Sequence, residues 1–159
     1  MNRHFLEAIT LYRSPKGFRF MFNKALIASD GSEPSKHAIR YYLELAPRDT
    51  EVLILTVTHA PRDPRAEPPD RFIVQKGQMW ELHQESVALA KQLRQDIVIN
   101  SLFKEGLASE VISEIAEEEN VDLVVMGNRG LGGVKEWLLG STCKAVINTI
   151  HKPIMIIKM

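Results

Sequence analysis

The sequence predicts an α/β fold, in which an open five-stranded parallel sheet carries helices on both of its faces. Short runs of apolar residues alternate, from Lys24 onward, with longer segments whose apolar residues recur at helical spacing. Strands that are buried on both sides read as continuous apolar runs, so the pattern favours a sheet covered on both faces. The length of 159 residues is typical of one domain.

In the first half of the chain, turn and breaker residues separate the expected elements. Ser32 can cap a helix that has Pro34 in its first turn, and Pro47 ends that helix. Four prolines among charges make residues 60–70 an irregular surface loop. We therefore expect, in order, a strand at 25–28, a helix from Ser32 to Ala46, a strand at 52–57, the loop, and a helix from about 78 to 95.

The second half continues the same alternation. Ser109 is the expected cap of a helix that ends at Asn120, and Gly127 ends the apolar run that follows it. Pro153 precedes the last apolar run. The expected elements are a strand at 97–103, the helix from Ser109 to Asn120, a strand at 121–126, a helix at 140–150 and a strand at 154–157.

The expected strand order is 3-2-1-4-5, with right-handed crossovers. The strand order reverses between the first and fourth strands, and their carboxyl ends then flank a crevice of the kind that binds ligands in open α/β sheets. Ser29-Asp30 and Met126-Gly127 stand at those two ends. The two most distinctive loops of the chain are therefore expected to converge.

The composition excludes several classes of function. Lys plus Arg and Asp plus Glu number 20 each, so no overall field attracts nucleic acid or an anionic membrane. No apolar run approaches the roughly 20 residues of a membrane span. The one cysteine, Cys143, fits a reducing cytoplasm and is expected to be a small buried residue. No histidine pair has the spacing of metal ligands, so we expect no protein-held metal.

The glycine-rich segment after the fourth strand carries the functional signal. It reads Gly127-x2-Gly130-x9-Gly140-Ser141 and leads from a strand into a helix start, as phosphate-binding loops do. It is not a Walker A loop, because Gly133 stands where lysine is required, nor a Rossmann loop, because Lys135 replaces the third glycine. The simpler alternative is that these glycines are ordinary turn residues.

This spacing resembles the ATP-binding signature of the universal stress protein family. The segments ALIASDGSEPSKHAIRYYLELA and HKPIMIIK also look like segments of that family, so the resemblance covers residues 24–158. It implies a fold like that of the adenine nucleotide α-hydrolases and a cytoplasmic, regulatory stress-response protein that binds ATP. ADP or AMP are alternatives, and Mg²⁺ or Mn²⁺ would be held through the phosphates.

The resemblance also implies which residues form the site, with no catalytic residue among them. Asp30 would hydrogen-bond the ribose or the adenine edge, and Val57 would contact adenine. Gly130 and Gly140 would leave space for the phosphates or adopt a backbone that other residues disfavour. The complete expected set is Ala28, Ser29, Asp30, Val57, Met126, Gly127, Arg129, Gly130, Gly140, Ser141 and Thr142.

Simpler roles remain open for several of these residues. Asp30 can be a turn residue before Gly31, Arg129 a solvated loop charge, and Ser141 merely the start of a helix. Two other functions also remain open: a slow ATP-hydrolysing enzyme that uses the same pocket, and a nucleotide-free dimeric adaptor. The protein partner of a regulatory protein is not indicated by the sequence.

The two ends of the chain carry separate expectations. Residues 1–22 are expected to be an appendage to a domain at 23–159, either a real arm or a mis-called start before Met21. Ile154 to Ile157 form an apolar strand that should lie at the sheet edge, where an unpaired strand invites pairing. The family resemblance implies a homodimer through this strand. The alternative is that residues 1–22 fold back and cover it.

Overall fold

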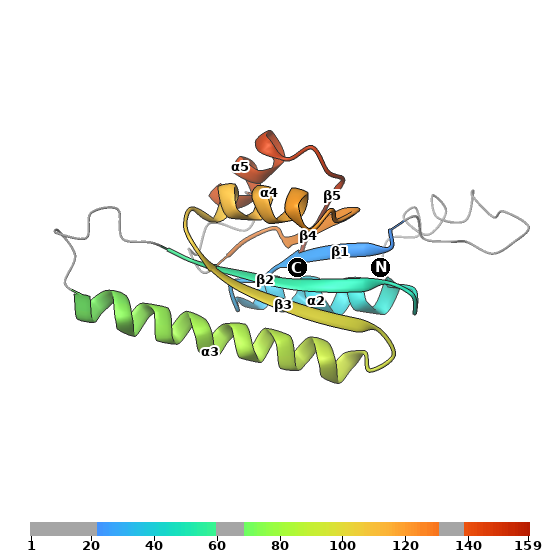
Figure 1. Cartoon of the computed structure of the whole chain (residues 1–159), viewed down its shortest axis with the longest axis horizontal. Helices are drawn as coiled ribbons and strands as arrows, with labels where there is room; N and C mark the ends of the chain where they lie inside the picture. The colour runs from blue at the N-terminus through green and yellow to red at the C-terminus, as the bar shows by residue number, and fades with distance from the viewer. Residues whose placement is uncertain (1–21, 60–68, 131–138) are drawn as a thin grey trace, which may run out of the picture.

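A computed structural model describes residues 22–59, 69–130 and 139–159. Its sheet has five parallel strands in the order β3-β2-β1-β4-β5 (Figure 1). The fold class and the strand order predicted from the sequence are therefore confirmed. The strands are β1 (Lys24–Ala28), β2 (Glu51–Thr58), β3 (Val98–Glu105), β4 (Leu123–Gly127) and β5 (Ile154–Ile157).

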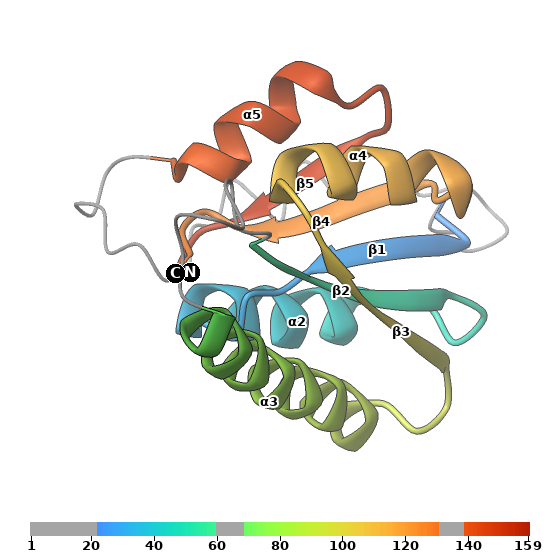
Figure 2. The ribbon, with the colours of Figure 1, turned by 60° about the vertical axis from the view of Figure 1, so that its left-hand side comes forward.

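Two helices cover each face of the sheet (Figure 2). Because side chains alternate along a strand, Ala25 and Ile27 of β1 pack into one apolar core and Leu26 packs into the other. The first core is closed by α2 (Glu33–Leu45) and α3 (Pro69–Leu93). The second core is closed by α4 (Ala108–Glu118) and α5 (Ser141–Thr149).

Helix α2 begins as the sequence predicts. The hydroxyl of Ser32 caps it by accepting a hydrogen bond from the backbone N–H of Ser35 at 3.4 Å, and Pro34 lies in its first turn. The helix ends at Leu45, before Pro47. This capping places the amino end of α2 beside the carboxyl end of β1.

Helix α3 begins earlier than predicted. It starts at Pro69, not near residue 78, so the loop expected at 60–70 ends at least two residues earlier than predicted. Residues 60–68 lie outside the described part of the chain. The first turns of α3 extend past the ends of the strands (Figure 1), where Ile73 and Val74 are 65% and 60% exposed. Because these turns do not pack on the sheet, they carry no amphipathic pattern for the sequence to reveal.

The predicted cap of α4 is wrong. The helix begins at Ala108, its N-cap is Leu107 with no side-chain hydrogen bond, and Ser109 lies inside the first turn. The amide of Gly106 donates to the carbonyl of Thr58 at 3.0 Å at the end of β3, so the chain turns into the helix directly after it. The helix ends at Glu118. Asn120, two residues later, has a φ of 45°, which a right-handed helix does not allow.

Strand β5 lies at the edge of the sheet, as predicted. Its Ile157 is buried, and its other side chains are partly buried against the two cores. None of the helices in the described ranges has the length and apolar character needed to cross a membrane. The expected N-terminal appendage falls on residues 1–21, which are outside the described residues, and on Phe22, which packs against the first core.

Candidate functional site

A cavity of about 300 Å³ opens at the carboxyl ends of β1 and β4. This is the position at which the strand order reverses, where open α/β sheets bind their ligands. The structure brings every site residue expected from the sequence to the wall of this cavity: Ala28, Ser29, Asp30, Val57, Met126, Gly127, Arg129, Gly130, Gly140, Ser141 and Thr142.

Five further residues line the cavity that the sequence did not indicate. Leu55 precedes Val57 by two residues and therefore points to the same face of β2. Ala108 and Ile112 are one helical turn apart on α4. The strand and helix periodicities could have revealed these three, whereas Ser35 and Cys143 carry no such signal.

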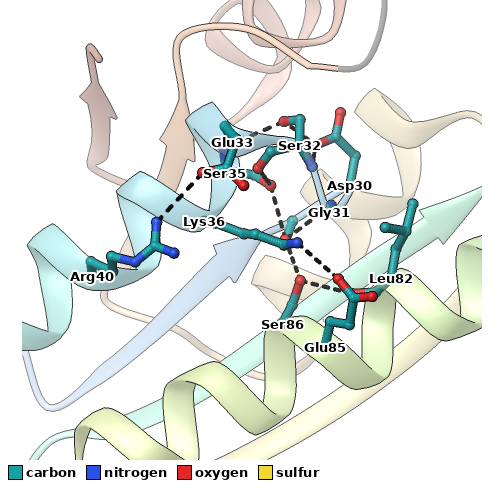
Figure 3. A network of polar contacts seen from close by, with 11 residues as sticks. Asp30, Gly31, Ser32, Glu33, Ser35, Lys36, Arg40, Leu82, Glu85 and Ser86 are labelled. Atoms are coloured by element: carbon teal, nitrogen blue, oxygen red, sulfur yellow. Dashed lines mark hydrogen bonds and ion pairs between the residues drawn. The ribbon is translucent and has the colours of Figure 1, made fainter.

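Asp30 is held by the loop that joins β1 to α2. Its Oδ1 accepts hydrogen bonds from the Ser32 backbone N–H at 3.0 Å and from the Ser32 hydroxyl at 2.5 Å (Figure 3). Gly31, with a φ of +78°, makes the turn between them. Asp30 is thus a turn residue that also lines the cavity, so the turn role and the binding role considered from the sequence are compatible.

The packing of the protein itself favours glycine at the end of β4 and in the loop that follows it. A Cβ on Gly130 would overlap a carboxylate oxygen of Asp30. A Cβ on Gly127 would lie 2.6 Å from the backbone oxygen of Pro34, in the first turn of α2. Gly130 therefore allows the loop after β4 to approach the β1–α2 loop closely, and Gly127 allows the end of β4 to approach α2.

Gly140 differs from both of them. It is the N-cap of α5, with ordinary φ and ψ of −60° and 157°, and its N–H donates to the carbonyl of Asn128 at 2.9 Å. The nearest atom to a Cβ there, the Arg129 Cα, is 3.7 Å away. The expectation of a disfavoured backbone is wrong for Gly130 and Gly140, because the described glycines with positive φ are Gly31 and Gly106.

The first turn of α5 faces the cavity. Ser141 and Thr142, its first two residues, both line the wall. Backbone N–H groups in the first turn of a helix have no partner within the helix, and the positive end of the helix dipole lies there. This side of the cavity can therefore bind an anion, while the Leu55 and Val57 side can contact an apolar ring.

Comparison with known proteins identifies the family. The model of the universal stress protein family matches residues 21–158. This chain belongs to the universal stress protein family. Universal stress protein YxiE of Bacillus subtilis is 30% identical over 151 residues, which cover 87% of this chain and all of YxiE.

Solved structures of universal stress proteins share the fold. The structure of MJ0577 from Methanocaldococcus jannaschii superimposes with a TM-score of 0.74 at 27% identity, over 88% of this chain and 98% of that one. A universal stress protein family member from Arabidopsis thaliana, described with AMP bound, has a TM-score of 0.59 at 19% identity, over 86% and 91% of the two chains.

Cys143 of this universal stress protein is a buried wall residue. The residue is 3% exposed, and its thiol donates to the carbonyl of Gly127 at 3.0 Å. Burial raises the pKa of the thiol, and the negative charge of Asp30 raises it further. The thiol therefore stays protonated near neutral pH, which agrees with the expected buried role. Within the described ranges, no group of three or more His, Cys, Asp or Glu side chains could hold a metal ion.

Proposed function

We propose that this universal stress protein binds ATP, or a related adenine nucleotide, in the cavity at the carboxyl ends of β1 and β4. One observation carries the proposal: Asp30 and the first turn of α5 line the same cavity at the point where the strand order reverses. A carboxylate suits the hydroxyl or amino groups of a nucleoside, and a helix amino end suits phosphates. Such an arrangement can hold both parts of a nucleotide.

Each wall of the cavity has a proposed role. Leu55 and Val57 contact the adenine ring, and Asp30 accepts hydrogen bonds from the ribose or the base edge. Ser141 and Thr142 donate their amides and hydroxyls to the phosphates, with Arg129 beside the ribose and phosphates. Mg²⁺ or Mn²⁺ is held through the phosphates, since phosphate oxygens are ligands that these ions favour. The AMP-bound relative from Arabidopsis supports an adenine ligand for this fold.

We propose that the protein acts in the cytoplasm as a nucleotide-dependent regulatory or stress-response protein, with little or no turnover of ATP. Among the described residues that line the cavity, Asp30 is the one with a carboxylate. Its Oδ1 already accepts two hydrogen bonds from Ser32. Because Asp30 is proposed to bind the nucleoside, the described lining residues leave no other carboxylate to activate a water at the phosphates. Phosphate release from ATP should therefore be far slower than the roughly 1–100 s⁻¹ of kinases. Robust release by contaminant-free protein would favour the slow-hydrolase alternative.

The direct test is calorimetric titration of the purified protein with ATP, ADP and AMP, after mass spectrometry of co-purified small molecules.

Gly140→Val is the informative variant, because the protein leaves room for a Cβ there. The variant should fold and lose nucleotide binding, since its side chain enters the space proposed for phosphate. Gly77→Val is the matched control, because nothing lies within 4 Å of a Cβ at Gly77. Unchanged affinity in folded Gly140→Val would contradict the proposal, and a wild type without nucleotide would favour the dimeric adaptor.

A further inference from the structure

Three buried serine hydroxyls connect the cavity to α3. The Ser29 Oγ lies 3.0 Å from the Ser35 Oγ and 2.9 Å from the Ser86 Oγ. Ser29 and Ser35 line the cavity, whereas Ser86 belongs to α3 and stands behind the cavity wall. Their residues are at most 4% exposed. A polar path therefore leads from the cavity, through the end of β1, to α3.

The three hydroxyls make more hydrogen-bond contacts than they have protons to donate. Ser35 donates its hydroxyl proton to the carbonyl of Ser32, and Ser86 donates its own to the carbonyl of Leu82, both at 2.9 Å. A hydroxyl has one proton to donate. Ser29 can then donate to Ser35 or to Ser86 but not to both, so one of these short contacts lacks a proton unless Ser35 or Ser86 turns toward Ser29.

Turning a hydroxyl costs little here, because both carbonyls keep a backbone partner. The carbonyl of Ser32 also accepts the N–H of Lys36 at 2.9 Å. The carbonyl of Leu82 faces the N–H of Ser86 one turn later in α3, as in any α-helix. The Ser86 hydroxyl therefore has two available acceptors, Leu82 within its own helix and Ser29 at the cavity. Each orientation of the hydroxyl serves a different partner, one inside α3 and one at the cavity.

Ser29 in turn holds the loop that presents Asp30. Its Oγ accepts the backbone N–H of Gly31 at 3.3 Å. Gly31 packs so closely on α3 that a Cβ would lie 2.5 Å from the Cβ of Leu82. The segment of α3 from Leu82 to Ser86 thus contacts the loop by packing and through the Ser29 hydroxyl.

We propose that Ser86 is a positioning residue for the nucleotide site, through which α3 sets the orientation of the Asp30 loop. It acts on the ligand through Ser29 and does not touch the ligand itself. This inference rests on the proposed function, since it assigns to α3 control over the affinity of the same cavity. The first half of α3 exposes apolar side chains, with Ile73 65% and Val74 60% exposed, so a partner that binds there would act on nucleotide affinity through this helix.

A double-mutant cycle tests the path. Ser86→Ala should weaken ATP binding about two- to tenfold, the effect of losing one ordinary hydrogen bond. In the Ser29→Ala background the same change should have no effect on affinity, because Ser86 then has nothing to act through. Equal effects of Ser86→Ala in both backgrounds would overturn the inference, as would an unchanged affinity in the single variant.

The matched control is Ser113→Ala. The Ser113 hydroxyl also donates to the carbonyl one turn earlier, at 2.9 Å, and also contacts a second hydroxyl, Thr149 Oγ1, at 3.0 Å. It lies on α4 and does not line the cavity. Ser113→Ala should leave ATP affinity unchanged, and a loss equal to that of Ser86→Ala would show a merely structural effect and overturn the inference.

A second measurement separates this inference from the proposed function. Amide exchange of the ligand-free protein, followed by NMR, should be faster at Gly31 in Ser86→Ala than in the wild type or in Ser113→Ala. An unchanged exchange rate at Gly31 would overturn the positioning role whether or not nucleotide binds. Faster exchange in a protein that binds no nucleotide would support the contact from α3 to the loop and overturn the proposed function.

Discussion

The carboxylate of Asp30 occupies the space that a Cβ on Gly130 would fill. These residues are far apart in the sequence but meet because β1 and β4 pair in parallel, from Ala25 with Leu123 to Ala28 with Met126. The loops at the carboxyl ends of the two strands therefore leave the sheet side by side. Gly130 is glycine for a reason internal to the protein, in addition to any role toward a ligand.

Gly130→Ala should destabilise the protein by about 1–3 kcal/mol, the usual cost of overpacking. In the Asp30→Ala background the cost should fall, because the overlapping carboxylate is absent. Urea unfolding of the four proteins measures both values. An equal cost of Gly130→Ala in the two backgrounds would show that its methyl meets something other than Asp30.

Gly127 and Gly77 should respond in opposite directions to alanine. Gly127→Ala places a Cβ 2.6 Å from the Pro34 carbonyl oxygen, a backbone atom that cannot move alone, so the free energy of unfolding should drop by at least about 1–3 kcal/mol. Gly77→Ala adds a methyl in open space within α3 and should stabilise by up to about 1 kcal/mol. Urea denaturation checks the two signs, and a stabilising Gly127→Ala would contradict the close packing of β4 against α2.

His83 should make stability fall in mild acid. The residue is 2% exposed, its Nδ1 lies 2.9 Å from the Thr56 hydroxyl, and Trp80 and Phe103 lie beside its ring. Burial lowers the pKa of His83 from 6.5. The folded protein therefore binds this proton less readily than the unfolded chain, and stability is lost as the pH falls from about 6.5 toward the folded pKa.

The measurement is the free energy of unfolding between pH 7.5 and pH 5 for wild type and His83→Gln. The variant should lose part of the pH dependence, whatever its stability at pH 7.5. His151→Gln is the control, because His151 is exposed. A pH dependence that is the same in His83→Gln and in wild type would mean that other groups cause it.

The edge strand β5 should form the homodimer. The carbonyls of Pro153 and Ile157 accept hydrogen bonds from β4, so by alternation the backbone groups of Ile154 and Ile156 face the open edge. Ile156→Pro removes an outward N–H without removing a bond to β4, and should yield folded monomers by light scattering and circular dichroism.

Deleting residues 153–159 should give monomers or aggregates, because Ile157 belongs to the core. Deleting residues 1–20 should leave the dimer intact, and a wild type that is monomeric at high micromolar concentration would contradict the prediction.

The sheet, its strand order and most of the residues that line the cavity could be predicted from the sequence. Apolar runs such as Val121 to Met126 and the amphipathic pattern of α2 are local signals, and right-handed crossovers leave few topologies for them. Asp30 lies two residues after β1 and Gly127 is the last residue of β4, so the parallel topology alone brings them to one end of the sheet.

The tertiary structure alone decided what no local pattern carries. The first turns of α3 do not pack on the sheet, so their helical conformation left no apolar periodicity in the sequence. Ser29 and Ser86 meet only because α3 crosses behind the end of β1, and the small serine side chain gives no sign of a partner elsewhere in the chain. Gly127, Gly130 and Gly140 look alike in the sequence, but the fold gives each a different neighbour. Gly127 lies against α2, Gly130 lies against Asp30, and Gly140 has room for a Cβ at the cavity.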